Sequence, residues 1–317
     1  MKMVEHKVIM RGRAVRGRGA IPSAAGAVLI RLENSLHGAV DVAFRRSSTA
    51  GRRQPWLRQA GQVEFRDIER TGKEEMVLYF EAPAFGDVAQ DYYSQTMLFD
   101  DRPPAEDTAF DVLADAVADV LAGKADSDKY DVGLLKRFQR YQSTVFEKEV
   151  DELLISGHRL PQSKPSRISQ EFPERARDLY LQTPKPARVR IAGKLDMIQA
   201  STLAFALLLP GGEQVRGVWK GDDFETLRML ANSDVAATGM AIYRPSGGLL
   251  RIDADALTPQ RPADRFFARM PKPTGGKLDL KALVREQQRR GGLAAIGGKI
   301  AAEESDEEFL AAVAEMD

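Results

Sequence analysis

Apolar side chains recur at every fourth position after Pro22, the spacing that places them along one face of a helix. The pattern predicts an amphipathic helix that begins at Ser23, whose side chain can cap it, and ends near Phe44. The members of this apolar stripe are Val28, Leu32, Leu36, Val40 and Phe44.

The chain that follows alternates between strand-like and helical patterns. Residues 63–68 and 76–80 predict a hairpin with its turn at residues 71–73. Residues 150–155 are also strand-like. Helical spacing predicts a helix over residues 86–95, one opened by Thr108 and ended by Gly123, one over the first half of the ambiguous segment 131–156, and one over residues 172–181.

The most regular strand pattern lies between residues 188 and 255. The pattern predicts five strands, over residues 188–198, 203–209, 214–220, 235–243 and 249–255. A short helix, capped by Asp222 or Asp223, is predicted between the third and fourth strands. This order of elements resembles that of an OB-fold barrel, and the resemblance implies a ligand-binding scaffold. It rests on element order without a motif, and a small SH3-like barrel is the alternative.

The predicted fold class is α+β. Residues 1–155 form an N-terminal mixed α/β domain, and residues 156–186 a connecting segment with a short helix. Residues 187–258 form the five-stranded OB-like barrel. Residues 259–317 begin as a proline- and glycine-rich linker and continue as a helical C-terminal tail.

Composition narrows the function classes. Hydrophobic residues make up 43% of the 317 positions and charged residues 29%, the balance of a folded protein with a buried core. Cysteine is absent, which excludes disulfides, thiolate metal sites and cysteine nucleophiles. The three histidines, His6, His37 and His158, are too scattered for a zinc-ligand pair on one helix. Without an apolar run of membrane-spanning length, we expect a cytoplasmic protein that does not enter a membrane.

Charge is distributed unevenly although 46 basic residues balance 46 acidic ones. Residues 1–60 hold 12 Lys or Arg against 3 Asp or Glu, and residues 61–130 hold 6 against 17. One interpretation is that the two segments pack together and neutralise each other. The other is that the arginines face a phosphate backbone.

The glycine-rich segment before the first helix is the first candidate nucleic-acid site. Its glycines only partly match a dinucleotide-binding fingerprint, because Pro22 stands where that motif needs glycine. Anion binding near the helix N-terminus and a neutralised basic loop both remain open. The candidate residues are Arg11, Arg13, Arg16 and Arg18.

The barrel carries the second candidate nucleic-acid surface. Strand alternation places Arg188, Arg190 and Lys194 on one face, and Arg216 and Lys220 repeat the pattern on the third strand. OB-fold proteins add aromatic stacking platforms to such a groove. Trp219 should point inward, which leaves Tyr243, and secondarily Phe205, as the platforms.

Acidic motifs give no catalytic or metal-site prediction. Residues 126–131 alternate acids as a calcium loop does, but Asp131 and Arg137 occupy the places of the required Gly and Glu. The helical row Asp111, Asp115 and Asp119 should face water or a basic partner. Since no G-x-S-x-G elbow occurs either, we predict no catalytic residues, no cofactor and no metal.

The end of the chain predicts a docking element. Ser305 and Glu308 form a capping box for a helix over residues 307–315, too short to be stable alone in water. Its apolar side is the predicted partner-binding surface, made by Phe309, Leu310, Val313 and Met316.

Two binding functions follow. The first is a non-catalytic protein-partner component of a larger bacterial assembly, of the adaptor, antitoxin-like or immunity kind. The second is a nucleic-acid-binding protein that uses the basic face of the barrel and the arginine loop. The identity of the partner and the oligomeric state are not predicted.

Overall fold

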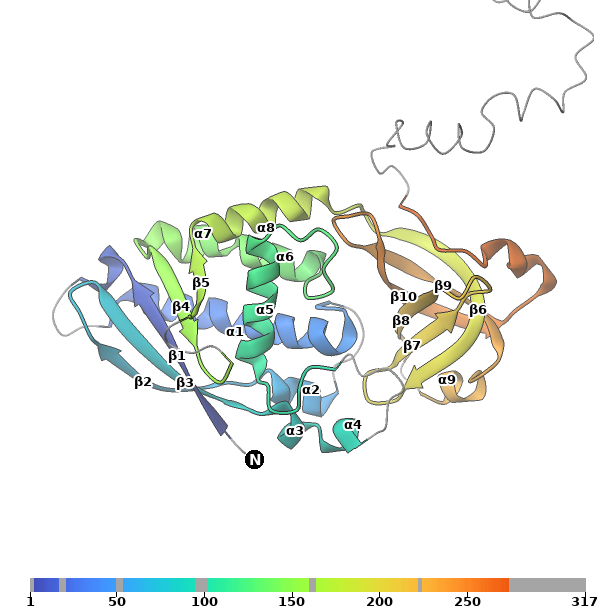
Figure 1. The fold of residues 1–317 in the computed structure, drawn as a ribbon, viewed down its shortest axis with the longest axis horizontal. Helices are drawn as coiled ribbons and strands as arrows, with labels where there is room; N and C mark the ends of the chain where they lie inside the picture. Colours follow the sequence, from blue (N-terminus) through green and yellow to red (C-terminus); the bar gives the residue numbers. More distant parts are fainter. Residues whose placement is uncertain are drawn as a thin grey trace, which may run out of the picture. The chain divides into compact units, whose positions relative to one another are not determined.

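A computed structural model describes residues 3–16, 21–49, 54–94, 102–159, 164–221 and 224–273 (Figure 1). All of these belong to one compact unit, Met1–Thr274. The predicted docking residues Phe309, Leu310, Val313 and Met316, and the loop residue Arg18, lie outside the described residues. Among the described helices, none is long and apolar enough to cross a membrane.

The N-terminal part is built on a five-stranded antiparallel sheet with the order β2-β3-β1-β4-β5. The predicted hairpin is present as β2 and β3. Along β1, His6, Val8 and Met10 are buried on one face, whereas the neighbours between them are less buried, the alternation of a strand covered on one side. The strands are β1 (Met3–Arg11), β2 (Glu64–Arg70), β3 (Glu75–Pro83), β4 (Glu152–Ser156) and β5 (Ser166–Ser169).

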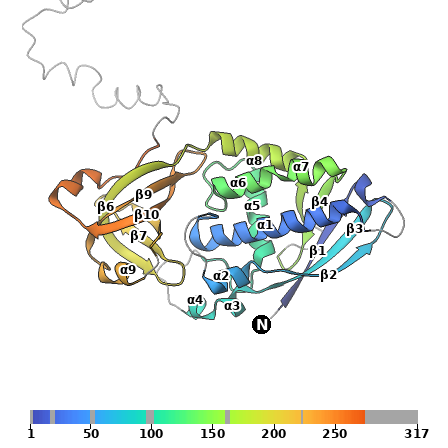
Figure 2. The ribbon, with the colours of Figure 1, turned by 180° about the vertical axis from the view of Figure 1, so that it is seen from behind.

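Helices close the buried face of this sheet, as the view from behind in Figure 2 also shows. The α5 helix contacts β3 and β5, and α1 packs on α5. The predicted stripe of α1 from Val28 to Phe44 is buried throughout. The helices are α1 (Ser23–Arg45), α2 (Pro55–Ala60), α3 (Phe85–Val88), α4 (Gln90–Ser94), α5 (Ala109–Leu121), α6 (Val132–Gln139), α7 (Tyr141–Thr144) and α8 (Glu171–Gln182).

Three local expectations differ from the structure. The residue at the N-cap of α1 is Pro22 instead of Ser23, and no side chain caps this end. The helix predicted over residues 86–95 is two short helices, α3 and α4. Residues 156–186 do more than connect, because β5 joins the first sheet and Phe172, Ala176 and Leu179 of α8 enter the first hydrophobic core.

The row of aspartates on α5 does not face water. Asp111 forms a capping box with Thr108, and Asp119 accepts hydrogen bonds from Lys124 Nζ (2.6 Å) and Ser127 Oγ (2.8 Å). Both carboxylates are buried, and Asp115 pairs with Lys129 at 3.1 Å. The basic partners of this row come from the same chain.

The C-terminal part is a closed barrel of five strands in the order β10-β8-β7-β6-β9. Neighbours are antiparallel except β8 and β10, which run parallel. The predicted strands and intervening helix are present as β6 (Ala187–Gln199), β7 (Ala204–Leu208), β8 (Gln214–Trp219), α9 (Glu225–Met229), β9 (Asp234–Tyr243) and β10 (Leu249–Pro259). The α+β class and the small barrel are therefore confirmed.

Apolar side chains at alternate strand positions fill the inside of the barrel, as predicted. Ile191 and Leu195 of β6 and Val215 and Trp219 of β8 point into a second hydrophobic core, so the residues between them face outward. Beyond β10, the 3-10 helix Pro262–Phe267 is tied to the outside of β6 by an ion pair between Arg190 and Asp264.

Candidate functional site: an arginine pocket beside the barrel

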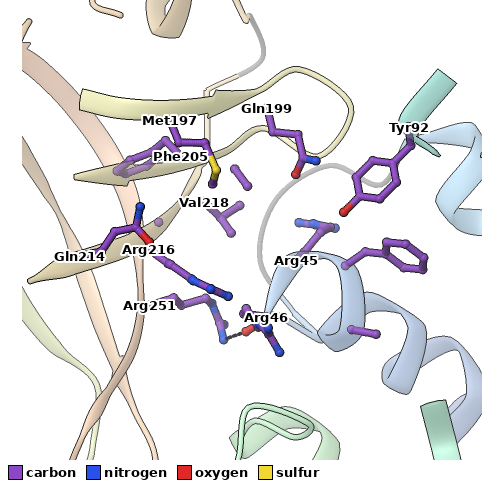
Figure 3. Close-up of a pocket in the computed structure, with 14 residues that line it drawn as sticks. Arg45, Arg46, Tyr92, Met197, Gln199, Phe205, Gln214, Arg216, Val218 and Arg251 are labelled. Atoms are coloured by element: carbon purple, nitrogen blue, oxygen red, sulfur yellow. Dashed lines mark hydrogen bonds between the residues drawn. The ribbon is translucent and has the colours of Figure 1, made fainter. Parts of the chain in front are cut away.

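A pocket of about 70 Å³ lies between the outer surface of β7 and β8 and the C-terminal end of α1 (Figure 3). Four arginines line it: Arg45 and Arg46 from α1 and the residue after it, Arg216 from β8, and Arg251 from β10. Among the described residues that line the pocket, none is an aspartate or glutamate. The pocket is therefore rich in guanidinium donors, of which Arg251 pairs with Asp131 and Asp253, and Arg46 with Asp128 at 3.9 Å.

The end of α1 brings two of these arginines to the pocket. Arg46 takes the left-handed conformation (φ 54°) that ends many helices, and its N–H donates to the Val42 carbonyl at 2.7 Å. The carbonyl of Arg46 in turn accepts a hydrogen bond from Arg251 Nη1. A guanidinium at this position donates to one of the carbonyls that have no partner within the helix at its C-terminus. Its positive charge also interacts favourably with the negative end of the helix dipole.

Arg251 is held in place by a buried network. Its side chain is only 1% exposed, and its Nε donates to Asp253 at 2.7 Å while Nη1 lies 3.4 Å from Asp131 Oδ2. Asp131 also accepts hydrogen bonds from Ser48 N (2.8 Å) and from Leu134 N (2.9 Å), which caps α6. A buried guanidinium requires such partners, because an unpaired charge there would be costly. Arg251 is thus a positioning residue.

The other polar groups point toward the same space in Figure 3. The amide of Gln199 descends from the end of β6, and the hydroxyl of Tyr92 and the guanidinium of Arg45 approach it from the opposite side. The Tyr92 ring is fixed by packing on Phe44 and Trp56, with ring centroids 5.3 Å away in each case.

Two loops of the barrel are hydrogen-bonded to the N-terminal part of the chain. Trp56 Nε1 of α2 donates to the Ser201 carbonyl in the β6–β7 loop at 3.2 Å. In the β9–β10 loop, Ser246 N donates to the Ala125 carbonyl at 3.0 Å, and Arg244 Nε donates to Asp128 Oδ1 at 2.8 Å. These contacts hold the barrel against the N-terminal part.

This arrangement is suited to an anion. A guanidinium carries five donors and no acceptor, and its planar fork matches the oxygens of a phosphate or carboxylate. Gln199 and Tyr92 add neutral donors. By the measure in which one water needs about 10–15 Å³, the pocket has room for about five to seven waters, enough for a small anion.

Two arginines of the predicted loop, Arg11 and Arg16, form ion pairs with acidic side chains. Arg11 pairs with Glu75 (2.7 Å) and Glu152 (3.0 Å), and Arg16 pairs with Glu74. Arg13 is exposed. The basic first segment thus packs beside the acidic second segment, the alternative in which the two neutralise each other.

The residues of the predicted basic face of the barrel differ in their partners and in their exposure. Arg188 forms a two-pronged ion pair with Asp255 (2.8 and 3.0 Å), and Arg190 forms another with Asp264 (2.8 and 3.0 Å). The hydrogen bonds from the Arg190 side chain, and then the one from the Arg261 backbone N–H, lower the pKa of Asp264 to about 2. Lys194 and Lys220 are exposed, and of the five predicted basic residues Arg216 is the one that lines the pocket.

Tyr243 does not fit its predicted role as a stacking platform. Its side chain is 1% exposed, and its hydroxyl donates to the Lys272 carbonyl at 3.2 Å. Phe205 is fully buried in the barrel core. Period-two alternation misses this because the chain after β10 covers Tyr243 from outside.

The other arginines of the pocket and its polar residues were missed in the sequence. Arg251 offered a signal, since it interrupts the apolar run Leu249–Ile252 and is followed two positions later by Asp253. The adjacent pair Arg45 and Arg46 at a predicted helix end was a weaker signal. Gln199 and Tyr92 carried none.

A second buried polar cluster lies between β1 and α5. Thr108 Oγ1 donates to Asp111 Oδ2 at 2.8 Å. His6 Nε2 lies 3.0 Å from Thr108 Oγ1, and because the hydroxyl proton is already donated to Asp111, His6 is the donor in this second hydrogen bond. The His6 ring is fully buried and stacks on Phe110 at 4.3 Å. Burial lowers the pKa of His6 to about 4, opposed by the charge of Asp111.

Asp107 adjoins this cluster and pairs with Arg159 (2.8 Å from Oδ1 to Nε). Burial nevertheless raises the pKa of Asp107 to about 6, because desolvation outweighs the nearby positive charge. His6 and Asp107 do not line the arginine pocket, and we assign this cluster to stability. Within the described ranges, no group of three or more His, Asp or Glu side chains is arranged to hold a metal ion.

Comparison of the chain with protein-family models, with curated proteins and with solved structures finds no match.

Proposed function

We propose that this protein is a non-enzymatic binding protein for single-stranded nucleic acid, which it holds by phosphate at the arginine pocket. The observation that carries the proposal is the position of the pocket against the outer surface of β7 and β8. Strand order supports treating the barrel as an OB-fold, because its first strand pairs with the second and fourth and its third runs parallel to its fifth.

The proposal draws on how OB-folds bind ligands. They use the face formed by their second and third strands, together with the loops after the first and fourth strands. In this chain those are β7, β8, the β6–β7 loop and the β9–β10 loop. The pocket is lined by residues of that face, among them Ala204 of β7 and Gln214, Arg216 and Val218 of β8.

Charge supports a nucleic-acid ligand over a neutral one. Arg216 and Arg46 reach the pocket wall from opposite sides, and guanidinium groups are the preferred partners of phosphate oxygens (Figure 3). The exposed aromatic platforms that many single-strand binders use are not supplied by Tyr243 or Phe205. We therefore expect binding dominated by phosphate contacts and weak dependence on base sequence.

Fluorescence anisotropy with labelled single-stranded DNA and RNA tests the proposal. Arg216→Gln should weaken binding about tenfold, and should reduce the slope of log affinity against log salt by about 0.7 because one phosphate contact is lost. Arg188→Gln is the matched control: it removes the same charge from the same barrel, at an exposed ion pair with Asp255. Equal effects of the two substitutions, or no binding by the unchanged protein at low salt, would reject the proposal.

Protein-partner binding remains the second candidate function. Phe266 and Phe267 at the end of the 3-10 helix Pro262–Phe267 are 66% and 42% exposed, which is unusual for adjacent large apolar side chains. If they dock a protein, the double substitution to Ser should abolish capture of that protein without lowering the melting temperature. Retained capture would exclude this surface.

A further inference from the structure

We infer that Phe266 and Phe267 form a stacking platform for the bases of a single strand, whose phosphates are bound beside the rings by Arg265, Arg269 and Lys272. This inference rests on the proposed function, and adds to it the contact that distinguishes unpaired bases from phosphate alone. The platform lies on the chain that follows β10, which runs along the outside of the barrel beside β6 (Figure 1).

The two rings are exposed although the element that carries them is anchored. Phe266 is 66% and Phe267 42% exposed, at the end of the 3-10 helix Pro262–Phe267. Just before the rings, the buried Asp264 accepts hydrogen bonds from Arg190 Nε (2.8 Å) and Nη2 (3.0 Å). Rings held outward by an anchored element are ordered before a ligand arrives, which lowers the entropy cost of binding.

The chain after the rings is anchored as well. Met270 packs against the hydrophobic core of the barrel, and the Lys272 carbonyl accepts a hydrogen bond from the Tyr243 hydroxyl at 3.2 Å. With the Asp264 contact before the rings and these two contacts after them, the segment is fastened at both ends. The exposure of the rings is therefore a property of a fixed segment.

The charge around the rings is positive. Residues 259–273 hold four basic side chains and one acidic side chain, that of Asp264, whose charge is paired with the barrel. Arg265, Arg269 and Lys272 are exposed, and within the described part of the chain no carboxylate forms an ion pair with them. Such cations attract a polyanion, and their N–H groups bind phosphate oxygens.

The combination of rings and cations favours nucleic acid over a protein or a lipid surface. Bases stack on aromatic rings and on guanidinium planes, and Arg265 Cζ lies 5.0 Å from the centroid of the Phe266 ring. Protein interfaces contain little lysine at their centres. A lipid surface needs a broader apolar face, whereas in residues 259–273 the exposed large apolar side chains are these two rings.

The platform also supplies a contact that the predicted residues do not. Tyr243 and Phe205 are buried, so neither can stack on a base. Stacking accepts every base because every base has a π-face, and the base must be unpaired to reach the ring. The platform therefore predicts that unpaired bases of any sequence add to the affinity that phosphates provide.

The test compares two strands with the same phosphates, an oligothymidylate and an abasic strand of equal length, each with a fluorescent label at one end. Anisotropy should show about tenfold tighter binding of the thymidylate, the effect of one stacked base. The double variant Phe266→Leu, Phe267→Leu keeps apolar area but removes the rings, so it should bind both strands equally with an unchanged salt slope. Phe65→Leu is the matched control, because Phe65 is 44% exposed on β2, and it should keep the difference.

The outcomes separate this inference from the proposed function. Equal binding of the two strands by the natural protein overturns the platform and leaves phosphate binding intact. An unchanged preference for thymidylate in the double variant places the stacked base elsewhere and also overturns the platform. Failure of both strands to bind overturns the proposed function as well. If the double variant loses the preference while Arg216→Gln binds as the natural protein does, the platform stands and the arginine pocket is rejected.

Two further measurements address other occupants of the rings. The first is co-sedimentation with vesicles of phosphatidylcholine and phosphatidylserine, and the second is capture of a protein partner. Either kind of binding, if the double variant loses it and excess thymidylate does not reduce it, assigns the rings to that occupant and overturns the platform. Displacement by thymidylate supports the platform.

Discussion

Arg251 and Asp131 are 120 residues apart in the sequence, yet Nη1 of the first lies 3.4 Å from Oδ2 of the second, and neither side chain is more than 1% exposed. Asp131 lies before α6 in the N-terminal part, and Arg251 belongs to the last strand of the barrel. This pair joins the N-terminal part to the barrel beside the arginine pocket.

Asp131→Ala should therefore be strongly destabilising. It removes the cap of α6, the partner of Ser48 and one of the two carboxylates at Arg251. Removing one partner of a buried ion pair costs about 3–5 kcal/mol, and Asp253, which still pairs with Arg251, should keep the loss at the lower end of that range. Urea denaturation measures the loss. Asp255→Ala breaks the exposed pair with Arg188 and should cost less than about 1 kcal/mol. Similar losses for the two variants would show that the buried network contributes little.

Gly157→Ala should destabilise the protein through His6. A Cβ at this position would lie 1.9 Å from His6 Nδ1, and the histidine is fully buried against Phe110. We expect a loss of about 1–3 kcal/mol from overpacking, measured by thermal denaturation. Gly211→Ala, where the added Cβ meets nothing within 4 Å, is the control. The double variant His6→Ala, Gly157→Ala should lose less than the two single losses together, and strict additivity would refute the clash.

Acid should act on His6 and Asp107 in opposite directions. The pKa of His6 is lowered from 6.5 to about 4, so its contribution to stability is lost as pH falls from about 6.5 toward 4. The pKa of Asp107 is raised from 3.8 to about 6, so its contribution is lost as pH rises from about 4 through 6. The two contributions offset each other in the natural protein.

Single substitutions should separate these contributions. Asp107→Asn should leave a protein that loses stability on acidification from pH 6.5 to 4, and His6→Asn should leave one that gains stability over the same range. Urea midpoints measured across this pH range give the slopes. Parallel slopes for the two variants would contradict the assignment of these pKa values.

Trp56 should report ligand binding by its fluorescence. The chain has two tryptophans, and Trp219 points into the barrel core. In a Trp219→Phe variant, single-stranded DNA should change the emission of Trp56, because its ring packs on Tyr92 at the pocket. The same titration of a Trp56→Phe variant serves as control. An unchanged Trp56 signal under conditions where anisotropy shows binding would place the ligand elsewhere.

Local patterns predicted most elements of the fold. The stripe in α1, the Thr108 cap of α5 and the alternation in β6 each depend on residues a few positions apart, and each is present. The barrel followed from the order of five such segments. The break between α3 and α4 was missed because helical spacing alone does not show where a helix is interrupted.

The candidate site was predicted far less well, because it is assembled over long distances. Arg46, Arg216 and Arg251 come from three elements, and no spacing links them. Arg188 and Arg190 were predicted by alternation to face outward, but alternation does not reveal that Asp255 and Asp264 pair with them. Charge that is neutralised by distant residues cannot be recognised from a local pattern.

The parallel pairing of β8 with β10 also sets the order in which the barrel can be completed during synthesis. β10 lies between β8 and β9, so both strands keep an open edge until residues 249–259 have left the ribosome. The barrel can therefore close only after its last strand has been made, and until then its two open edges are exposed to pairing with other chains.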